Sequence, residues 1–193
     1  MARSLLLVMD MINDLTSPDG PSAGTYVPIL KERSVIERAA SAIAAARRAG
    51  VLVGYVRVGF SPDYRECPPS SPVFSRARDV GLFKLGTWGT EVLSALAPEP
   101  GDFDIVKHRV SPFYGTSLEP ILRARGIERL YLSGVSTNGV VHAGAREAHD
   151  RDYECVVLAD CCAGATTDEH ETALKSMGRF TTIKQSTEIA FGG

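Results

Sequence analysis

Short apolar segments alternate with helical patterns along this chain, and that alternation limits the folds open to it. Residues 5–9 read Leu-Leu-Leu-Val-Met, a short run without polar positions that is typical of a strand buried on both faces. A helix is expected over about 33–49, with apolar residues at 35, 39 and 43 on one face, and a second strand at 51–58. This order predicts a parallel sheet with helices on both faces.

The same order continues in the second half of the chain. Further strands are expected at 104–107, 129–134, 154–159 and near 180–184. The helices expected between and after them cover about 116–126, 139–150 and a capped segment that starts at residue 166. Because no composition shift or repeat marks a boundary, we expect a single domain over residues 1–193.

Two stretches lack the regular spacing of apolar residues that is typical of a helix or a strand. Residues 16–28 are rich in turn-forming residues and are expected to form a loop. Residues 61–88 contain four prolines, and long loops in compact domains usually carry a function or an interface. A short helix is expected to follow over 89–96. Because the second stretch is also rich in apolar residues, we expect it to join the protomers of a homo-oligomer, a dimer or a tetramer.

The overall composition excludes several classes of partner. Of the 193 residues, 44% are hydrophobic and 23% are charged, and the net charge is -2, so there is no basic surplus with which to bind nucleic acid. No apolar stretch approaches the roughly 18 residues that a membrane helix needs. The four cysteines show no disulfide or zinc spacing. We therefore expect a cytoplasmic protein without a nucleic-acid or membrane partner.

Three segments that follow predicted strands carry candidate chemistry. Asp10 ends the first strand, where poor solvation can raise the pKa of a carboxylate and suit it to proton transfer. Lys107 ends the third strand and could pair with Asp10. Residues 133–140, Ser-Gly-Val-Ser-Thr-Asn-Gly-Val, lead into a helix whose unpaired N–H groups can hold an oxyanion. Each feature also has a purely structural alternative. Asp10 could cap a turn, Lys107 could be a surface lysine, and residues 133–140 could form an ordinary strand–helix turn.

Together these segments resemble the isochorismatase-like (cysteine hydrolase) superfamily. Residues 5–14 resemble its opening strand and catalytic aspartate, 107–113 its lysine motif, and 134–141 its nucleophile loop. The resemblance covers nearly the whole chain. It implies a three-layer α/β/α sandwich around a mainly parallel, Rossmann-like sheet of about six strands, together with frequent oligomerisation. It also implies that Asp10, Lys107 and the nucleophile loop converge at the carboxyl edge of the sheet.

The superfamily hydrolyses amides and related C–N bonds with an aspartate–lysine–cysteine triad. In this chain Asp10 and Lys107 match the first two positions, but the nucleophile position falls on Val140, which offers neither a nucleophile nor a proton. The isochorismatases within the superfamily also lack the cysteine; they protonate an enol ether and let water cleave it. They carry glycine where this chain has Val140, so the same substrate is not implied.

Three functions remain open. The first is hydrolysis of a small metabolite by acid–base catalysis through Asp10 and Lys107, without a thiol, at an enol ether or a related bond. The second is a catalytically inactive homologue that binds a small molecule or serves as a structural subunit. The third is hydrolysis of a C–N (amide) bond by a relocated thiol, for which Cys161, Cys162 and Cys67 are the candidates.

The resemblance also implies which residues of the nucleophile loop face the substrate: Val135, Ser136, Thr137, Asn138, Gly139 and Val140, with a cis peptide between the first two. Apart from the resemblance, the aromatic side chains of Trp88, Phe113 and Tyr114 are candidate apolar walls of a substrate pocket, and His142 on the helix after the loop is a candidate for its border. Packing in the core or at a subunit interface is the alternative for the aromatic residues, and packing is the alternative for His142.

His149 and His170 are expected at exposed helix positions. No cofactor is expected. No metal is expected either, because the Asp-x-His pair that some relatives use after the second strand is missing from residues 57–63.

Overall fold

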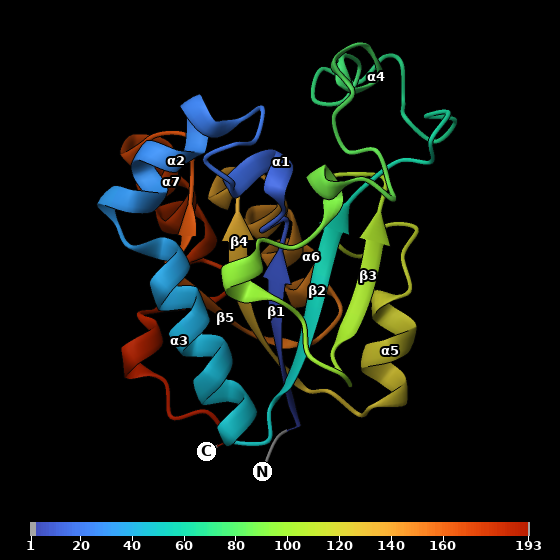
Figure 1. The fold of residues 1–193 in the computed structure, drawn as a ribbon. Helices are drawn as coiled ribbons and strands as arrows, with labels where there is room; N and C mark the ends of the chain where they lie inside the picture. Colours follow the sequence, from blue (N-terminus) through green and yellow to red (C-terminus); the bar gives the residue numbers. More distant parts are fainter. Residues whose placement is uncertain (1–2, 193) are drawn as a thin grey trace.

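The strand β1 (Ser4–Met9) lies at the centre of a six-stranded parallel sheet in the computed structural model, which describes residues 3–192 (Figure 1). The order of the strands across the sheet is β3-β2-β1-β4-β5-β6. Their bounds are β2 (Leu52–Val58), β3 (Phe103–Lys107), β4 (Arg129–Val135), β5 (Glu154–Ala163) and β6 (Thr182–Lys184). Helices cover both faces, so the predicted three-layer α/β/α sandwich is confirmed.

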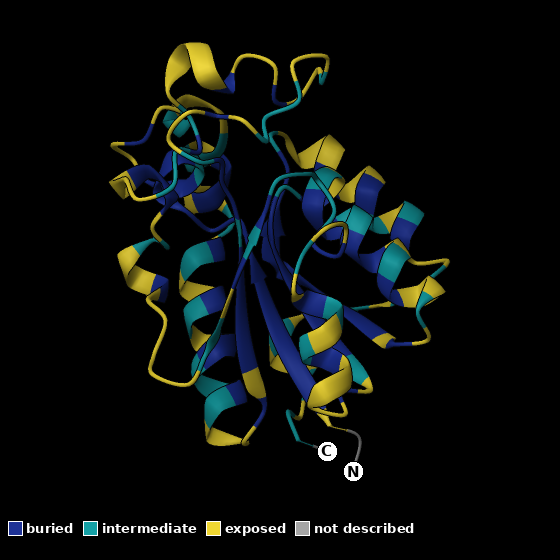
Figure 2. Cartoon of the chain, turned by 90° about the vertical axis from the view of Figure 1, so that its right-hand side faces the viewer, coloured by how far each residue is buried: buried dark blue, intermediate teal, exposed yellow. Residues whose placement is uncertain are grey.

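Side chains of β1 alternate between two hydrophobic cores. Leu5, Leu7 and Met9 pack on one face of the sheet, and Leu6 and Val8 pack on the other. The helices that close the first core are α5 (Leu118–Ala124), α6 (His142–Asp150) and α7 (Thr167–Met177), and those that close the second are α2 (Ala23–Glu32) and α3 (Val35–Arg48). Figure 2 shows the buried strands between these two helical layers. Burial on both faces explains why β1 has no polar position before its end.

The order of the strands reverses between β1 and β4, because the chain builds outward from β1 in one direction and from β4 in the other. In open parallel sheets, ligands bind beyond the carboxyl ends of the strands at such a reversal. Gly134 makes the close approach of these strands possible. Its φ is +153°, and a Cβ there would clash with the carbonyl oxygen of Met9. Only glycine fits this position without a shift of the backbone.

A π-helical turn, η3 (Thr137–Val141), follows β4 and leads into α6. Its buried Thr137 is held by His170 of α7, with 2.8 Å between Thr137 Oγ1 and His170 Nδ1. His170 Nε2 lies 2.9 Å from Arg33 Nη2. Because arginine can only donate, Nε2 accepts and Nδ1 of the neutral ring donates to Thr137. The prediction that His170 is exposed was wrong: its side chain is fully buried and ties α7 to the turn.

The longest connection runs from residue 59 to 102, between β2 and β3, and we call it the excursion. Its upper part stands out from the sheet (Figure 1). A small core of its own, which includes Phe60, Phe74 and Phe83, joins it to the end of β2. Its regular elements are short: α4 (Ala77–Val80), η1 (Trp88–Thr90) and η2 (Ser94–Leu96). The helix predicted over 89–96 was therefore wrong, and two 3-10 turns take its place.

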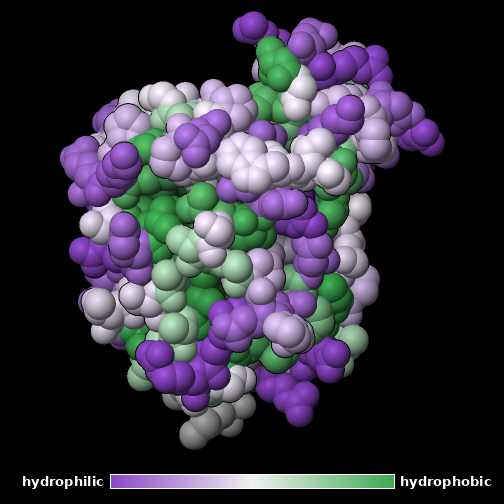
Figure 3. All heavy atoms as spheres, viewed as in Figure 1, coloured by the Kyte–Doolittle hydropathy of each residue, from purple (hydrophilic) through white to green (hydrophobic). Residues whose placement is uncertain are grey.

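The surface of the excursion is mostly hydrophilic, with isolated hydrophobic side chains (Figure 3). Val73, Val80 and Trp88 remain exposed, whereas Phe74 and Phe83 are used in its internal core. Self-association through this region stays a prediction. None of the helices in the described part of the chain is long and apolar enough to cross a membrane.

Two other elements differ from expectation. The stretch expected to be a loop over 16–28 begins at the last residue of α1 (Asn13–Thr16) and includes the first part of α2, with Pro28 inside that helix. The strand expected over 154–159 continues to Ala163, after a register irregularity against β4 between Leu132 and Gly134. Cys161 and Cys162 therefore lie inside β5 and not beyond it.

Burial of His170 predicts a pH dependence of stability. Burial and the nearby Arg33 lower its pKa from 6.5 to about 4. The unfolded chain thus takes up a proton near pH 6.5 and the folded chain only near pH 4, so stability falls as the pH decreases between these values. His170→Gln should reduce this loss by up to about 3 kcal/mol, measured by denaturant unfolding at pH 7 and pH 4. The exposed His149→Gln is the matched control; equal losses in both variants would contradict the assignment.

Candidate active site

Asp10 and Lys107 meet at the carboxyl edge of the sheet, as predicted. Asp10 directly follows β1, and Lys107 is the last residue of β3. Their charged groups lie 2.8 Å apart, from Asp10 Oδ2 to Lys107 Nζ. The other carboxylate oxygen accepts a hydrogen bond of 2.7 Å from the backbone N–H of Val58, in the strand between them. Lys107 also donates to the carbonyl oxygen of Arg109 at 3.0 Å.

The pair is almost closed to solvent, with 6% of the Asp10 side chain and 2% of the Lys107 side chain exposed. Burial raises the pKa of Asp10, and the charge of Lys107 and the two hydrogen bonds to the carboxylate oppose that rise. The backbone of Asp10 is left-handed, with φ of +55°, a conformation that aspartate adopts more readily than most residues. This turn directs the side chain across β2 toward Lys107. The arrangement places a buried carboxyl group, whose pKa burial raises, next to a fixed cation.

The nucleophile loop faces this pair. The Val135–Ser136 peptide is cis, as predicted. Ser136 forms a side-chain hydrogen bond with Tyr26 of α2, and its carbonyl oxygen accepts from the N–H groups of Gly139 and Val141. A Cβ at Gly139 would lie 2.7 Å from the Ser136 hydroxyl oxygen, so a side chain there would displace that hydroxyl. The loop is thus closely packed around Ser136.

A cavity of about 500 Å³ brings these groups together. Asp10, Lys107 and Val58 line it from the sheet. The loop contributes Val135, Ser136, Asn138, Gly139 and Val140, while Thr137 points away from it toward His170. The excursion contributes apolar side chains, and α2 with its preceding turn contributes hydroxyl groups. These are Val73, Phe74, Leu82 and Phe83 from the excursion, and Ser22, Thr25 and Tyr26 from the other side.

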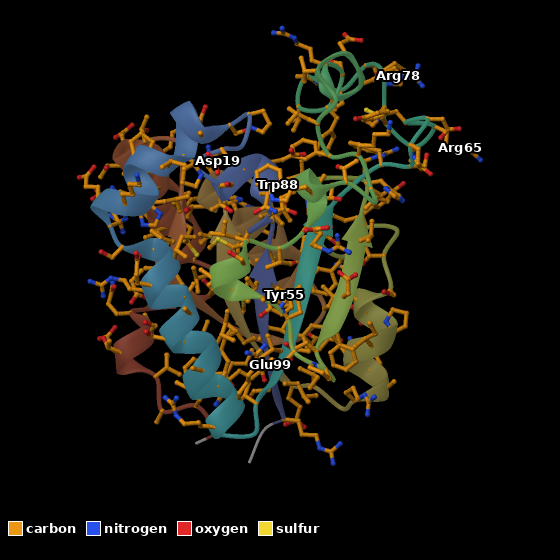
Figure 4. All side chains as sticks on the ribbon, in the orientation of Figure 1. Asp19, Tyr55, Arg65, Arg78, Trp88 and Glu99 are labelled. Atoms are coloured by element: carbon orange, nitrogen blue, oxygen red, sulfur yellow. The ribbon has the colours of Figure 1, made fainter. Side chains whose placement is uncertain are left out.

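The four predicted pocket residues outside the loop do not line this cavity, so its geometry does not support those predictions. Phe113 is a core residue stacked on Tyr153. Tyr114 is 68% exposed and borders a different hollow beside Cys67. Trp88 is 48% exposed at the surface (Figure 4), and its backbone carbonyl accepts from Asn13. His142 borders a separate groove between η3 and α7.

Sequence reasoning missed Tyr26 and the aromatic wall formed by Phe74 and Phe83. Tyr26 was hidden because its segment reads as a loop, although α2 starts at Ala23. The two phenylalanines stood in a proline-rich stretch assigned to subunit contacts. An apolar cluster within an irregular stretch was a usable signal, since a loop that packs on itself can also wall a pocket.

All four cysteines lie within residues 3–192, the part of the chain that the structure describes, and none of them lines the cavity. Cys155, Cys161 and Cys162 are buried, and burial raises the pKa of each thiol, to about 12 for Cys155 and Cys162. Cys67 donates to the carbonyl oxygen of Phe74, outside the cavity, and burial raises its pKa as well. Because the thiolate is the nucleophilic form, these positions do not support the relocated-thiol hypothesis.

The sequence predicts no bound metal, and this absence stays a prediction. Within residues 3–192 no three histidine, cysteine, aspartate or glutamate side chains lie close enough together to hold one metal ion.

Comparison with known proteins extends this picture. The isochorismatase domain matches residues 4–188. Ureidoacrylate amidohydrolase RutB of Methylorubrum extorquens is 37% identical over 169 residues, which cover 81% of this chain and 68% of the relative. An isochorismatase family protein from Desulfovibrio vulgaris has a similar structure, with a TM-score of 0.86 and 28% identity over 97% of this chain and 96% of that one. N-carbamoylsarcosine amidase from Thermoplasma acidophilum gives a TM-score of 0.77 and 30% identity, over 97% and 99%. The sheet, the order of the motifs and these similarities agree, and the chain belongs to the isochorismatase family of hydrolases.

Proposed function

We propose that this protein hydrolyses a small metabolite by acid–base catalysis through Asp10 and Lys107, without an enzyme nucleophile. One observation carries the proposal: the buried Asp10–Lys107 pair lines a cavity that none of the cysteines lines. Val140, at the position that the sequence assigns to the nucleophile, lines the same cavity with an inert side chain. Water is then the attacking group.

The pair suits bonds that break once they are protonated. Asp10 gives its proton to the carbon end of an enol ether, and the oxygen-stabilised cation that results is attacked by water. The adduct returns a proton to the Asp10 carboxylate and separates into an alcohol and a carbonyl compound. Lys107 and the Val58 N–H stabilise the carboxylate in the interval. No covalent bond to the protein is formed.

Amides form the second class of substrate to be screened, since two of the similar proteins are named as an amidohydrolase and an amidase. Without a nucleophilic side chain, water would have to attack the amide carbon directly, with Asp10 as the base. The N–H groups of the nucleophile loop would stabilise the oxyanion. Screening should therefore compare small vinyl ethers and small amides side by side.

A binding protein without turnover is the other candidate, and Val140 is the observation that favours it. A chain that has lost the nucleophile can keep the fold and a ligand pocket. Ligand binding in the cavity without hydrolysis of any vinyl ether or amide would favour this reading.

Asp10→Asn should lower turnover by about 10²–10⁴-fold, because it removes the proton that the proposed reaction needs. It also leaves Lys107 buried without its counter-ion, which destabilises the fold. The double variant Asp10→Asn/Lys107→Met removes both charges and should recover stability while remaining inactive. Initial rates and unfolding curves should be measured for both. Turnover within a factor of two of wild type in either folded variant would contradict the role of Asp10.

Val140→Cys should place a reactive thiol in the cavity that Lys107 also lines. Iodoacetamide should alkylate the introduced thiol in the native protein, as read by peptide mass mapping, while Cys155 and Cys162 stay unmodified. Val141→Cys is the matched control, because Val141 is fully buried and does not line the cavity. If the thiol at position 140 were as unreactive as that at position 141, the assignment of the nucleophile position would be wrong.

A further inference from the structure

The proposed reaction gives no role to Asp14, a buried acidic residue of α1 that follows Asp10 by four positions. Within residues 3–192, no lysine or arginine forms an ion pair with its carboxylate. Burial raises the pKa of Asp14, and a hydrogen bond from the backbone of Phe83 opposes that rise. Because a buried carboxylate without a cation is costly, the neutral groups that it contacts must account for its presence.

The carboxylate of Asp14 binds the backbone of Phe83, in the excursion. Its Oδ2 accepts a hydrogen bond of 2.7 Å from the N–H of Phe83. The carbonyl oxygen of Phe83 in turn accepts a hydrogen bond of 2.7 Å from the N–H of Phe60. Phe83 has a left-handed backbone, with φ of +59°, which bulky residues adopt only where the surroundings enforce it. The two hydrogen bonds hold Phe83 in this conformation.

The excursion also closes around the other side of this carboxylate. Gly89 lies so close to Asp14 that a Cβ on the glycine would clash with Oδ1. The three atoms nearest to such a Cβ all belong to the carboxyl group of Asp14. The neighbouring Asn13 donates from Nδ2 to the carbonyl oxygen of Trp88 at 2.8 Å. Asn13 and Asp14 thus bind two separate parts of the excursion, around residues 83 and 88.

The side chain of Phe83 is part of the cavity wall. It lines the cavity together with Phe74, and the two rings meet edge to face with 6.4 Å between their centroids. Asp10 and Lys107 line the same cavity. Because residues 10–14 form one short buried segment, the reacting carboxyl group of Asp10 and the anchor of the wall at Asp14 are fixed relative to one another.

We propose that Asp14 is a positioning residue, which sets the place of the Phe83 wall relative to Asp10 and so determines how tightly a ligand fits the cavity. Asp14 itself is not one of the described residues that line the cavity, so it acts through Phe83. This inference rests on the proposed function only in treating the cavity as the substrate site.

Amide hydrogen exchange in the full-length protein tests the contact without any ligand. Asp14→Ala should speed exchange of the Phe83 amide by about tenfold or more, because its buried N–H loses the acceptor. Asp14→Asn keeps an oxygen within reach of that N–H and should restore slow exchange. The Leu7 amide, in the central strand, reports global unfolding and should change less. An unchanged Phe83 amide, or equal acceleration of both amides, would overturn the proposal.

Gly89→Ala reaches the same contact by an independent route. Its methyl group should push the Asp14 carboxylate away from the Phe83 N–H and so speed exchange of that amide, even where Asp14→Ala does not fold. Combined with Asp14→Ala, it should add nothing further, because removal of the carboxylate makes room for the methyl group. Gly24→Ala is the matched control, since nothing lies within 4 Å of a Cβ there. Additive effects in the double variant, or slow exchange in Gly89→Ala, would contradict the proposal.

Steady-state kinetics test the consequence for the substrate, with the vinyl ether or amide that the screen identifies. An apolar wall contacts the substrate in the ground state and in the transition state alike. Asp14→Ala should therefore raise KM by about tenfold while kcat changes by less than about twofold, and Asp14→Asn should restore KM. A fall in kcat at unchanged KM would overturn the positioning role.

The two kinds of measurement separate this inference from the proposed function. Faster Phe83 exchange in Asp14→Ala and Gly89→Ala, with no turnover of any vinyl ether or amide, would keep the role of Asp14 in the wall and remove the hydrolytic function. Turnover by the wild-type protein together with unchanged Phe83 exchange in both variants would keep the hydrolytic function and remove the inference.

Discussion

One buried ion pair links three neighbouring strands at the edge of the sheet where the cavity lies. The Asp10 carboxylate follows β1, takes an N–H from β2 and reaches the ammonium group of Lys107 at the end of β3. Loss of either charge would leave the other buried without a partner, which typically costs about 3–5 kcal/mol. The register of the strands and the left-handed turn at Asp10 have to be compatible with this contact. The cavity is arranged around a charge pair that is also part of the framework.

The other side of the cavity depends on a different kind of contact. Arg33 donates to His170, and His170 donates to Thr137, so a neutral imidazole holds the turn that follows β4. The turn is also bound from α2 through Tyr26 and Ser136. The loop that lines the cavity is therefore fixed from two directions, by His170 at Thr137 and by Tyr26 at Ser136. Rigid support of this kind keeps the lining groups in place when a ligand enters.

The sequence allowed the sheet, Asp10, Lys107 and most of the loop to be predicted, because each depends on a local pattern. An apolar run that ends in a polar residue identifies a buried strand and its carboxyl end, and parallel pairing then brings such ends together. The direction of a side chain and the shape of a loop do not follow from such a local pattern of apolar and polar residues. Phe113 and Trp88 are both aromatic residues that the sequence suggested as pocket walls, yet one is in the core and the other is at the surface. α2 was missed because serine, glycine and proline near its start suggested a loop, while its packing on β1 is a tertiary effect.

The excursion has a consequence for how such a protein can diverge. Its aromatic wall is held by a small core of its own, at the end of β2, whereas the charge pair belongs to the central strands. The aromatic wall of the cavity is thus encoded in one continuous stretch, apart from the residues that fix the sheet. Substitutions in that stretch can reshape the wall while the strand register stays intact. The residues of the aromatic wall can therefore diverge at a different rate from the residues of the central strands, the wall changing quickly and the strands slowly.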